Sequence, residues 1–208
     1  MVRNWGRFAA ISAAMAYLAP LSAQTASVNA IAETDPVGTA GDAADDPAIW
    51  RNAKHPEKSL IVATDKKAGV HVYDLSGKRR SFTASPRLNN VDLRKGILLR
   101  NKRSVVVAAS DRFDVANAKI ALFMLQTNRK KLIPIGSIAV GAGEAYGMCL
   151  WTRKSDRVLF AFVVMKDGRI DQVALDLSGK LPAGRVVRSL KLATQSEGCV
   201  VDDRTGIL

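Results

Sequence analysis

Two short apolar runs decide the fold of this chain: Ser59-Leu-Ile-Val-Ala-Thr64 and Val70-His-Val-Tyr-Asp-Leu75. Both are rich in β-branched residues, and a short cluster of Asp, Lys and Gly separates them, which is typical of two strands joined by a tight turn. Similar runs return at 104–110, 120–125 and 158–164. No segment after about residue 44 keeps a helical apolar period. We therefore predict an all-β protein.

These strands repeat along the chain with a period near 50 residues. Val70, Ile120 and Ile170 each begin an apolar run, and each lies 50 residues from the next. The pentapeptide Asp-Leu-Ser-Gly-Lys occurs at 74–78 and again at 176–180, about two periods later. Such a period, with about four short strands in each unit, is typical of propeller blades. Chance similarity among β-hairpins is the alternative.

The repeat divides the chain into blades at roughly 44–88, 89–140 and 141–193, and a fourth blade begins near Ser196. A propeller closes its ring with at least four blades, and each repeat packs against its neighbours. Three blades and part of a fourth do not close a ring. We therefore expect the chain to be the front part of a longer propeller, with residues 205–208 starting a further strand.

The composition limits the class of protein. With 48% hydrophobic and 24% charged residues the chain is not intrinsically disordered, and two cysteines are too few for a disulfide-dense scaffold or a four-cysteine zinc site. No stretch reaches about 18 uninterrupted apolar residues, which excludes a polytopic membrane protein. The formal net charge of +12 indicates an anionic partner, and nucleic acid, anionic lipid and phosphorylated small molecules all fit it.

The first 23 residues have the pattern of a secretory signal peptide. Arg3 and Arg7 form a cationic start, and a run of small apolar residues leads through Pro20 to a cleavage site near Ala23. A membrane anchor is the alternative, but the run is short for one and Pro20 interrupts it. We therefore expect residues 24–208 to form the mature chain, secreted or periplasmic, with no stable membrane insertion.

The cysteines and histidines leave few options. Cys149 and Cys199 lie 50 residues apart, at similar places in successive blades, and form either a disulfide or two buried thiols. His55 and His71 are the only histidines, and neither has the sequence context of a histidine acid phosphatase. We expect His71 to be a strand residue. No G-x-S-x-G or P-loop pattern occurs, which argues against a serine hydrolase or a nucleotide-binding domain.

Charged residues gather in two patterns. Five carboxylates fall within residues 33–46, which indicates either a site for a hard cation such as Ca²⁺ or a solvated acidic turn. Lys66-Lys67, Arg112 and Lys166 occupy the corresponding turn in each of the three blades. Equivalent loops of a propeller lie on one face, so these cations either converge on an anion with several phosphates or only populate solvated turns. Basic runs elsewhere lack interleaved aromatic residues and are weak nucleic-acid sites.

Two motifs resemble the signature motifs of the β-propeller phytases, the calcium-dependent alkaline phytases. They are Asp-Ala-Ala-Asp-Asp-Pro-Ala-Ile-Trp at 42–50 and Asn-Asn-Val-Asp-Leu-Arg at 89–94. Thr-Asp-Lys-Lys-Ala-Gly at 64–69, Glu-Ala-Tyr-Gly at 144–147, Met-Lys-Asp-Gly at 165–168 and Ser-Glu-Gly at 196–198 are also similar to that family, in the same order. The resemblance covers residues 33–208.

The resemblance implies a six-bladed β-propeller with several Ca²⁺ ions at the mouth of its channel. It implies a monomer of 3-phytase type that removes phosphates stepwise from phytate, inositol hexakisphosphate, by metal-activated water, without nucleic acid as a partner. Three blades and the start of a fourth are present here, so this part of the protein can be inactive alone. A non-catalytic, calcium-stabilised propeller that binds polyanions is the second hypothesis, and a propeller enzyme of another class, such as a lactonase-like hydrolase, is the third.

The resemblance also assigns roles to individual residues, carried over by motif. The implied calcium ligands are Glu33, Asp45, Asp46, Asn90, Asp92 and Glu197. The implied substrate phosphate contacts are Lys66, Lys67, Arg112, Tyr146 and Lys166. The implied catalytic set is Asp45, Asp46, Lys66 and Tyr146.

Overall fold

The computed structural model describes residues 26–208, so the predicted signal peptide at 1–23 lies outside the described residues. The chain divides into an N-terminal segment, Met1–Ile31, and a unit from Ala32 to Leu208 that contains all the strands. In the part of the chain that the structure describes, the only helical element is one turn of 3-10 helix at Pro56–Lys58. The prediction of an all-β protein is confirmed.

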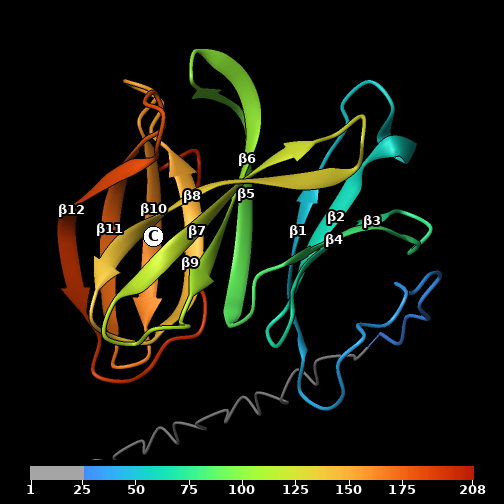
Figure 1. Cartoon of the computed structure of the whole chain (residues 1–208), viewed down its shortest axis with the longest axis horizontal. Coiled ribbons are helices and arrows are strands. Elements are labelled where there is room, and N and C mark those ends of the chain that lie inside the picture. Colours follow the sequence, from blue (N-terminus) through green and yellow to red (C-terminus); the bar gives the residue numbers. More distant parts are fainter. Residues whose placement is uncertain (1–25) are drawn as a thin grey trace, which may run out of the picture. The chain divides into compact units, whose positions relative to one another are not determined.

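Three four-stranded antiparallel sheets follow one another along the chain (Figure 1). The first sheet contains β1 (Ala44–Trp50), β2 (Leu60–Asp65), β3 (Gly69–Asp74) and β4 (Arg79–Ala84). The second contains β5 (Leu88–Leu99), β6 (Lys102–Asp111), β7 (Ala118–Gln126) and β8 (Lys131–Gly141). The third contains β9 (Ala145–Thr152), β10 (Leu159–Met165), β11 (Arg169–Asp176) and β12 (Ala183–Lys191). Spatial order equals chain order in each sheet, and the sheets coincide with the three predicted repeat units to within a few residues.

The three sheets pack face against face, with their first strands together. Strand β5 contacts β1 on one side and β9 on the other, while the outer strand β8 contacts β4 and β12. The second sheet therefore lies between the other two.

The sequence of β6 explains how the second sheet serves both neighbours. Val106 and Ala108 pack into the core shared with the third sheet, whereas Val107 and Ala109 pack into the core shared with the first. Successive side chains of a strand point to opposite faces, so a strand buried on both faces reads as a continuous apolar run rather than an alternating one.

The repeated pentapeptide forms the same Asp–Ser bonds in the first and third sheets, although the turns that follow differ in length. Ser76 donates its backbone N–H and its hydroxyl to Asp74 Oδ1 at 3.1 and 2.6 Å, and Ser178 makes the same bonds to Asp176 Oδ1 at 2.9 and 2.6 Å. When an Asp side chain accepts the backbone N–H of the residue two positions later, the segment forms an Asx turn. Such a turn reverses the chain and needs no side chain from elsewhere. The repeat seen in the sequence is therefore a repeat in space.

The last segment corrects one prediction and decides another. Residues 205–208 form no strand; they close a turn in which Asp202 N–H donates to the Ile207 carbonyl at 2.9 Å. Because this segment bonds to itself, it pairs with no sheet edge. Cys199, just before it, forms a disulfide with Cys149 of β9, so the pairing alternative is correct.

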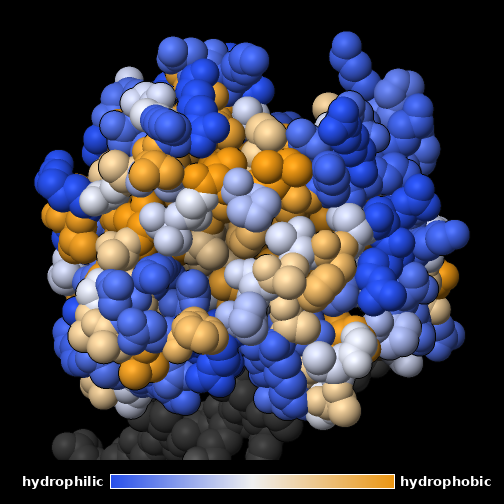
Figure 2. All heavy atoms as spheres, viewed as in Figure 1, coloured by the Kyte–Doolittle hydropathy of each residue, from blue (hydrophilic) through white to orange (hydrophobic). Residues whose placement is uncertain are grey.

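The surface is mixed in character. Figure 2 shows hydrophobic side chains over the middle of the viewed face and hydrophilic ones around its margins. Across residues 26–208 we find no helix long and apolar enough to cross a membrane.

Candidate functional site

The predicted site residues come mostly from one end of the three sheets. Each first strand begins opposite the end of the second strand, as in the pairs Ala44–Asp65, Leu88–Asp111 and Ala145–Met165. The starts of β1, β5 and β9 therefore lie beside the β2–β3, β6–β7 and β10–β11 turns, and we call this end of the unit the site end. The turns carry Lys66, Lys67, Arg112 and Lys166, as the sequence predicted.

Four side chains from the second and third sheets meet at the site end, and we call them the Tyr146 cluster: Arg112, Glu144, Tyr146 and Lys166. Glu144 Oε1 accepts a bond from Arg112 Nη1 at 2.8 Å, and Glu144 Oε2 lies 3.4 Å from Lys166 Nζ. Arg112 Cζ and Lys166 Nζ are 5.1 and 5.2 Å from the centre of the Tyr146 ring, within cation–π range. One carboxylate and one aromatic ring therefore hold two cations together.

Lys66 forms a second charged group with carboxylates that precede and begin β1. Its Nζ lies 2.8 Å from Asp42 Oδ1 and 3.4 Å from Asp45 Oδ1. The bond between Lys66 and Asp42 lowers the pKa of the carboxyl and raises that of the ammonium group. Lys67 and Arg112 also lower the pKa of Asp42 by their charge, so positive charge from two different turns acts on the same region.

Asp46 joins the first sheet to the second. Its Oδ2 accepts the backbone N–H of Val91 in β5 at 2.9 Å, and its own N–H donates to the Thr64 hydroxyl at 3.1 Å. Burial raises the pKa of Asp46, the Val91 N–H partly offsets this, and the nearby charges of Asp45 and Asp92 add to the rise. Within residues 26–208, Asp46 has no ion pair and no donor on Oδ1. A half-buried carboxylate in this condition favours a cation as a partner.

Asp92 joins the second sheet to the third by the same kind of bond. Its Oδ2 accepts the Leu150 N–H of β9 at 2.8 Å. Unlike Asp46, it is also paired with an arginine, because Arg94 Nη1 lies 2.9 and 3.1 Å from its two oxygens. Arg94 in turn donates to the Leu150 carbonyl. Both oxygens of Asp92 are therefore engaged with protein donors.

Asn90 and Glu197 lie near one another beside the Tyr146 cluster. Asn89 Nδ2 donates to Asn90 Oδ1 at 2.9 Å and to the Tyr146 carbonyl at 2.8 Å, which fixes the start of β5 against β9. The Glu197 carbonyl passes so close to Gly147 that a Cβ there would come within 2.0 Å of it. Only glycine fits at that position.

Glu33 lies apart from the other predicted ligands. A Cβ on Gly77, in the β3–β4 turn, would come within 1.7 Å of the Glu33 carbonyl. Asp35 fixes the segment there, because its N–H donates to the Gly77 carbonyl at 2.7 Å and its carboxylate accepts the Arg79 N–H at 2.8 Å. This turn is at the opposite end of the first sheet from Asp45 and Asp46, so the expectation that Glu33 supports their cluster is not met.

The donors at the site end suit a hard cation in type. Asp45, Asp46 and Asn90 offer oxygen ligands, which Ca²⁺ requires, and Asp46 is half-buried with one oxygen unengaged by residues 26–208. Across the described residues, however, no three Asp, Glu, His or Cys side chains gather as a ready metal site.

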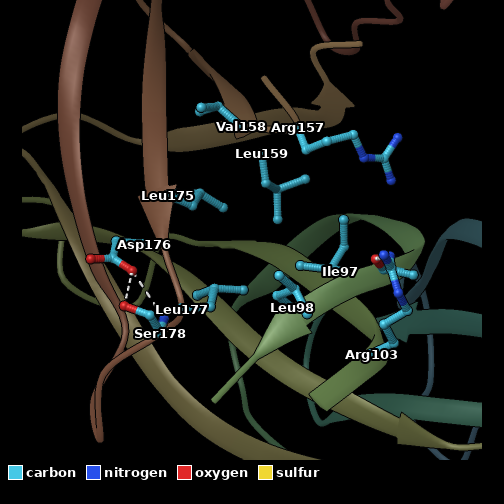
Figure 3. A pocket seen from close by; sticks show the side chains of 11 residues that line it. Ile97, Leu98, Arg103, Arg157, Val158, Leu159, Leu175, Asp176, Leu177 and Ser178 are labelled. Atoms are coloured by element: carbon cyan, nitrogen blue, oxygen red, sulfur yellow. Dashed lines mark hydrogen bonds between the residues drawn. The ribbon is translucent and has the colours of Figure 1, made fainter. Parts of the chain in front are cut away.

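A different hollow lies at the opposite end, between the second and third sheets (Figure 3). It has a volume of about 290 Å³, with an apolar lining that includes Ile97, Leu159, Leu175 and Leu177. The side chains of Arg103 and Arg157 also line it. None of the predicted site residues lies in it, so it is separate from the charged groups at the site end.

The fold and the site end define a class: an all-β protein of repeated four-stranded sheets whose equivalent turns present cations beside carboxylates. A family model described as Phytase matches residues 7–208. The chain belongs to the phytase family. The 3-phytase of Bacillus subtilis (strain 168) is 40% identical to it over 186 residues, which is 87% of this chain and 48% of the relative. The chain thus spans about half the length of that relative.

Sequence reasoning missed two charged residues, Glu144 at the site end and Arg94 in the middle of β5. Both stand inside motifs that were noticed, Glu-Ala-Tyr-Gly and Asn-Asn-Val-Asp-Leu-Arg. The available signal was charge: Glu144 is an acidic residue beside predicted phosphate contacts, and Arg94 is a basic residue two positions after a predicted metal ligand. Arg94 neutralises Asp92, which was assigned as a metal ligand, and Glu144 neutralises Arg112, which was assigned as a phosphate contact.

Proposed function

We propose that the protein containing this chain is a 3-phytase type phosphatase that removes phosphates one after another from phytate, inositol hexakisphosphate. The observation that carries the proposal is the recurrence of cations at the equivalent turns of three sheets, at Lys66, Lys67, Arg112 and Lys166. A ligand with several phosphates on one ring engages several such turns at once. Membership of the phytase family supports this substrate over other polyanions.

The side chains have distinct tasks in this proposal. Arg112 binds a phosphate through the planar edge that Glu144 leaves open, since a guanidinium donates two parallel bonds. Lys66, Lys67 and Lys166 supply further positive charges for the other phosphates. Tyr146 supplies a hydroxyl donor, and its own ring contacts two of the cations, Arg112 and Lys166.

We propose that calcium completes this site, with Asp45, Asp46, Asn90 and Glu197 as the residues that would hold it. When bound, Ca²⁺ supplies positive charge against the phosphate oxygens and lowers the pKa of nearby water. The unpaired charge on Asp46 supports this assignment. Asp92 stabilises a sheet junction instead, because Arg94 already neutralises it.

We further propose that the three sheets are blades of a six-bladed propeller. Contact between consecutive first strands, and between consecutive outer strands, supports a radial arrangement. We also propose that the protein is exported and acts as a monomer, with residues 1–23 as the signal peptide. The Cys149–Cys199 disulfide supports an oxidising destination.

The test is phosphate release from inositol hexakisphosphate by the expressed protein that contains this chain, with calcium and with a chelator. We expect chelation to lower the rate at least about tenfold, a barrier change of about 1.4 kcal/mol. Equal rates in both conditions contradict calcium dependence, and no release in either contradicts the enzymatic proposal.

A second candidate function is a non-catalytic, calcium-stabilised propeller that binds polyanions. The same recurrence of cations at equivalent turns favours it, because binding a polyanion needs those cations and no activated water. Calorimetry separates the two functions, because this candidate binds inositol hexakisphosphate and releases no phosphate from it.

A further inference from the structure

We infer that Glu144 is a positioning residue that holds Arg112 and Lys166 in the geometry needed to bind a phosphate. The inference rests on the proposed function, because it concerns the same anion site. Glu144 directly precedes β9 and reaches the turns of two different sheets. Its two carboxylate oxygens divide between the two cations, with Oε1 on Arg112 at 2.8 Å and Oε2 near Lys166 at 3.4 Å.

The contacts of Arg112 show why the carboxylate leaves room for a ligand. The Arg112 side chain is 12% exposed, and Glu144 engages it through Nη1 alone. Its Nε is buried and has no hydrogen-bond partner in the described part of the chain. A guanidinium has five N–H donors, so the donors that Glu144 does not use remain available to an anion. A buried donor without a partner is costly, and an arriving phosphate oxygen relieves that cost.

Tyr146 restricts the same two cations from another side. Both lie within 5.2 Å of its ring centre, so neither rotates away without losing that contact. The Lys166 N–H also donates to the Glu144 carbonyl at 3.0 Å, which ties the β10–β11 turn to Glu144 through the backbone. Without the carboxylate, two positive groups that face one ring repel each other and separate.

The sign of the effect distinguishes positioning from simple charge. Removing an acidic residue near an anion site makes the site more positive and strengthens anion binding. If Glu144 positions Arg112 and Lys166, its removal weakens binding instead. Glu57 offers a matched control, because it lies in the 3-10 turn with only His55 as an ion-pair neighbour among residues 26–208, and its side chain is 67% exposed.

The experiment measures binding of inositol hexakisphosphate by calorimetry for the protein that contains this chain, both unchanged (the parent) and as the variants Glu144→Gln, Glu144→Asp and Glu57→Gln. We expect Glu144→Gln to raise Kd about tenfold, the effect of losing one hydrogen bond to a charged group. Glu144→Asp recovers part of the affinity, and Glu57→Gln stays within about twofold of the parent. Urea unfolding of each variant shows whether the fold is kept, and a Kd change at an unchanged midpoint marks positioning.

The outcomes are separable. Tighter binding or an unchanged Kd in Glu144→Gln overturns the inference and leaves the proposed function standing. A parent protein that binds no inositol hexakisphosphate overturns the proposed function, and the inference with it. If Glu144→Gln unfolds, the test uses Glu144→Asp together with Arg112→Gln. The inference is overturned if both variants bind inositol hexakisphosphate with the Kd of the parent.

Discussion

Asp46 and Asp92 make the same bond at two neighbouring junctions, but among residues 26–208 only Asp92 is paired with a cation. Each carboxylate extends from a first strand to a backbone N–H of the next first strand, Val91 in one case and Leu150 in the other. Arg94 neutralises Asp92, whereas Asp46 has no ion pair within residues 26–208 and its pKa is raised by burial.

The difference shows how one kind of contact serves two purposes. A carboxylate that is paired as well as hydrogen-bonded holds two sheets together and needs no further partner. A carboxylate that is hydrogen-bonded but unpaired holds the sheets together and keeps a charge for a ligand. The following predictions test this contrast, from the largest expected effect to the smallest.

The disulfide between Cys149 and Cys199 fastens the segment after β12 to β9, on the face of the third sheet opposite to the Asp92 junction. Replacing both cysteines, as Cys149→Ala with Cys199→Ala, is expected to lower the free energy of unfolding by about 3 kcal/mol, because the unfolded chain gains conformational freedom. Urea unfolding under non-reducing conditions measures the loss. An unfolding midpoint equal to that of the parent contradicts a stabilising role.

Asp92→Ala is expected to destabilise the chain by about 2 kcal/mol. It leaves the Leu150 N–H without its acceptor and Arg94 without its partner, and both side chains of the pair are partly exposed, which keeps the cost below that of a fully buried pair. Asp203→Ala, at an exposed position, is the control and stays within about 0.5 kcal/mol of the parent. Urea unfolding measures the loss of stability in both variants. Equal losses contradict a stabilising role for Asp92 at the junction.

Asp46→Asn is expected to change stability by no more than about 1 kcal/mol without calcium, because the amide keeps an acceptor for the Val91 N–H and removes an unpaired buried charge. It is expected to lose the gain in melting temperature that calcium gives the parent. Asp92→Asn is the matched control and keeps that gain. A calcium response that survives in Asp46→Asn refutes the assignment of Asp46 as a ligand.

His71 extends the comparison to a buried polar group with no partner at all. It is 3% exposed, packs between the Tyr73 and Phe82 rings, and neither ring nitrogen has a hydrogen-bond partner among the described residues. Burial lowers its pKa below the ordinary value of 6.5, and the charge of Arg79 lowers it further. Its strand position in β3 is as predicted.

The sign of the pH effect follows from that lowered pKa. Below about pH 6.5 the unfolded chain binds a proton at His71 before the folded chain does, so folding stability falls as the pH falls towards the folded pKa. His71→Phe is expected to remove this fall and to match the parent within about 1 kcal/mol at pH 8. Urea unfolding between pH 8 and pH 5 measures it, with His55→Gln as the exposed control. A parallel pH dependence in His71→Phe and the parent contradicts the explanation.

Local patterns predicted the fold well. The 50-residue period located three sheets, and the Asp-Leu-Ser-Gly-Lys repeat became the same Asp–Ser bonds formed twice, because an Asx turn depends only on residues close in sequence. The prediction for residues 205–208 failed because a strand needs an edge to pair with, and an apolar dipeptide does not reveal one.

The site was predicted by the same repeat, but only in part. Equivalent turns brought Arg112 and Lys166 together near Tyr146, as the blade argument implied. Arg94 went unassigned although its partner Asp92 is two positions away, whereas Glu144 went unassigned and Glu33 was expected elsewhere because their partners are set by contacts between distant segments. Such contacts leave no periodic trace in the sequence.

The alternation of Val106 and Val107 has a consequence for folding. Since the middle sheet has an apolar face toward each neighbour, it is not stable until at least one of them has formed against it. The smallest cooperative unit is then a facing pair of sheets rather than a single sheet. Each further sheet then folds by packing its apolar face against a sheet that has already formed, as in linear repeat proteins.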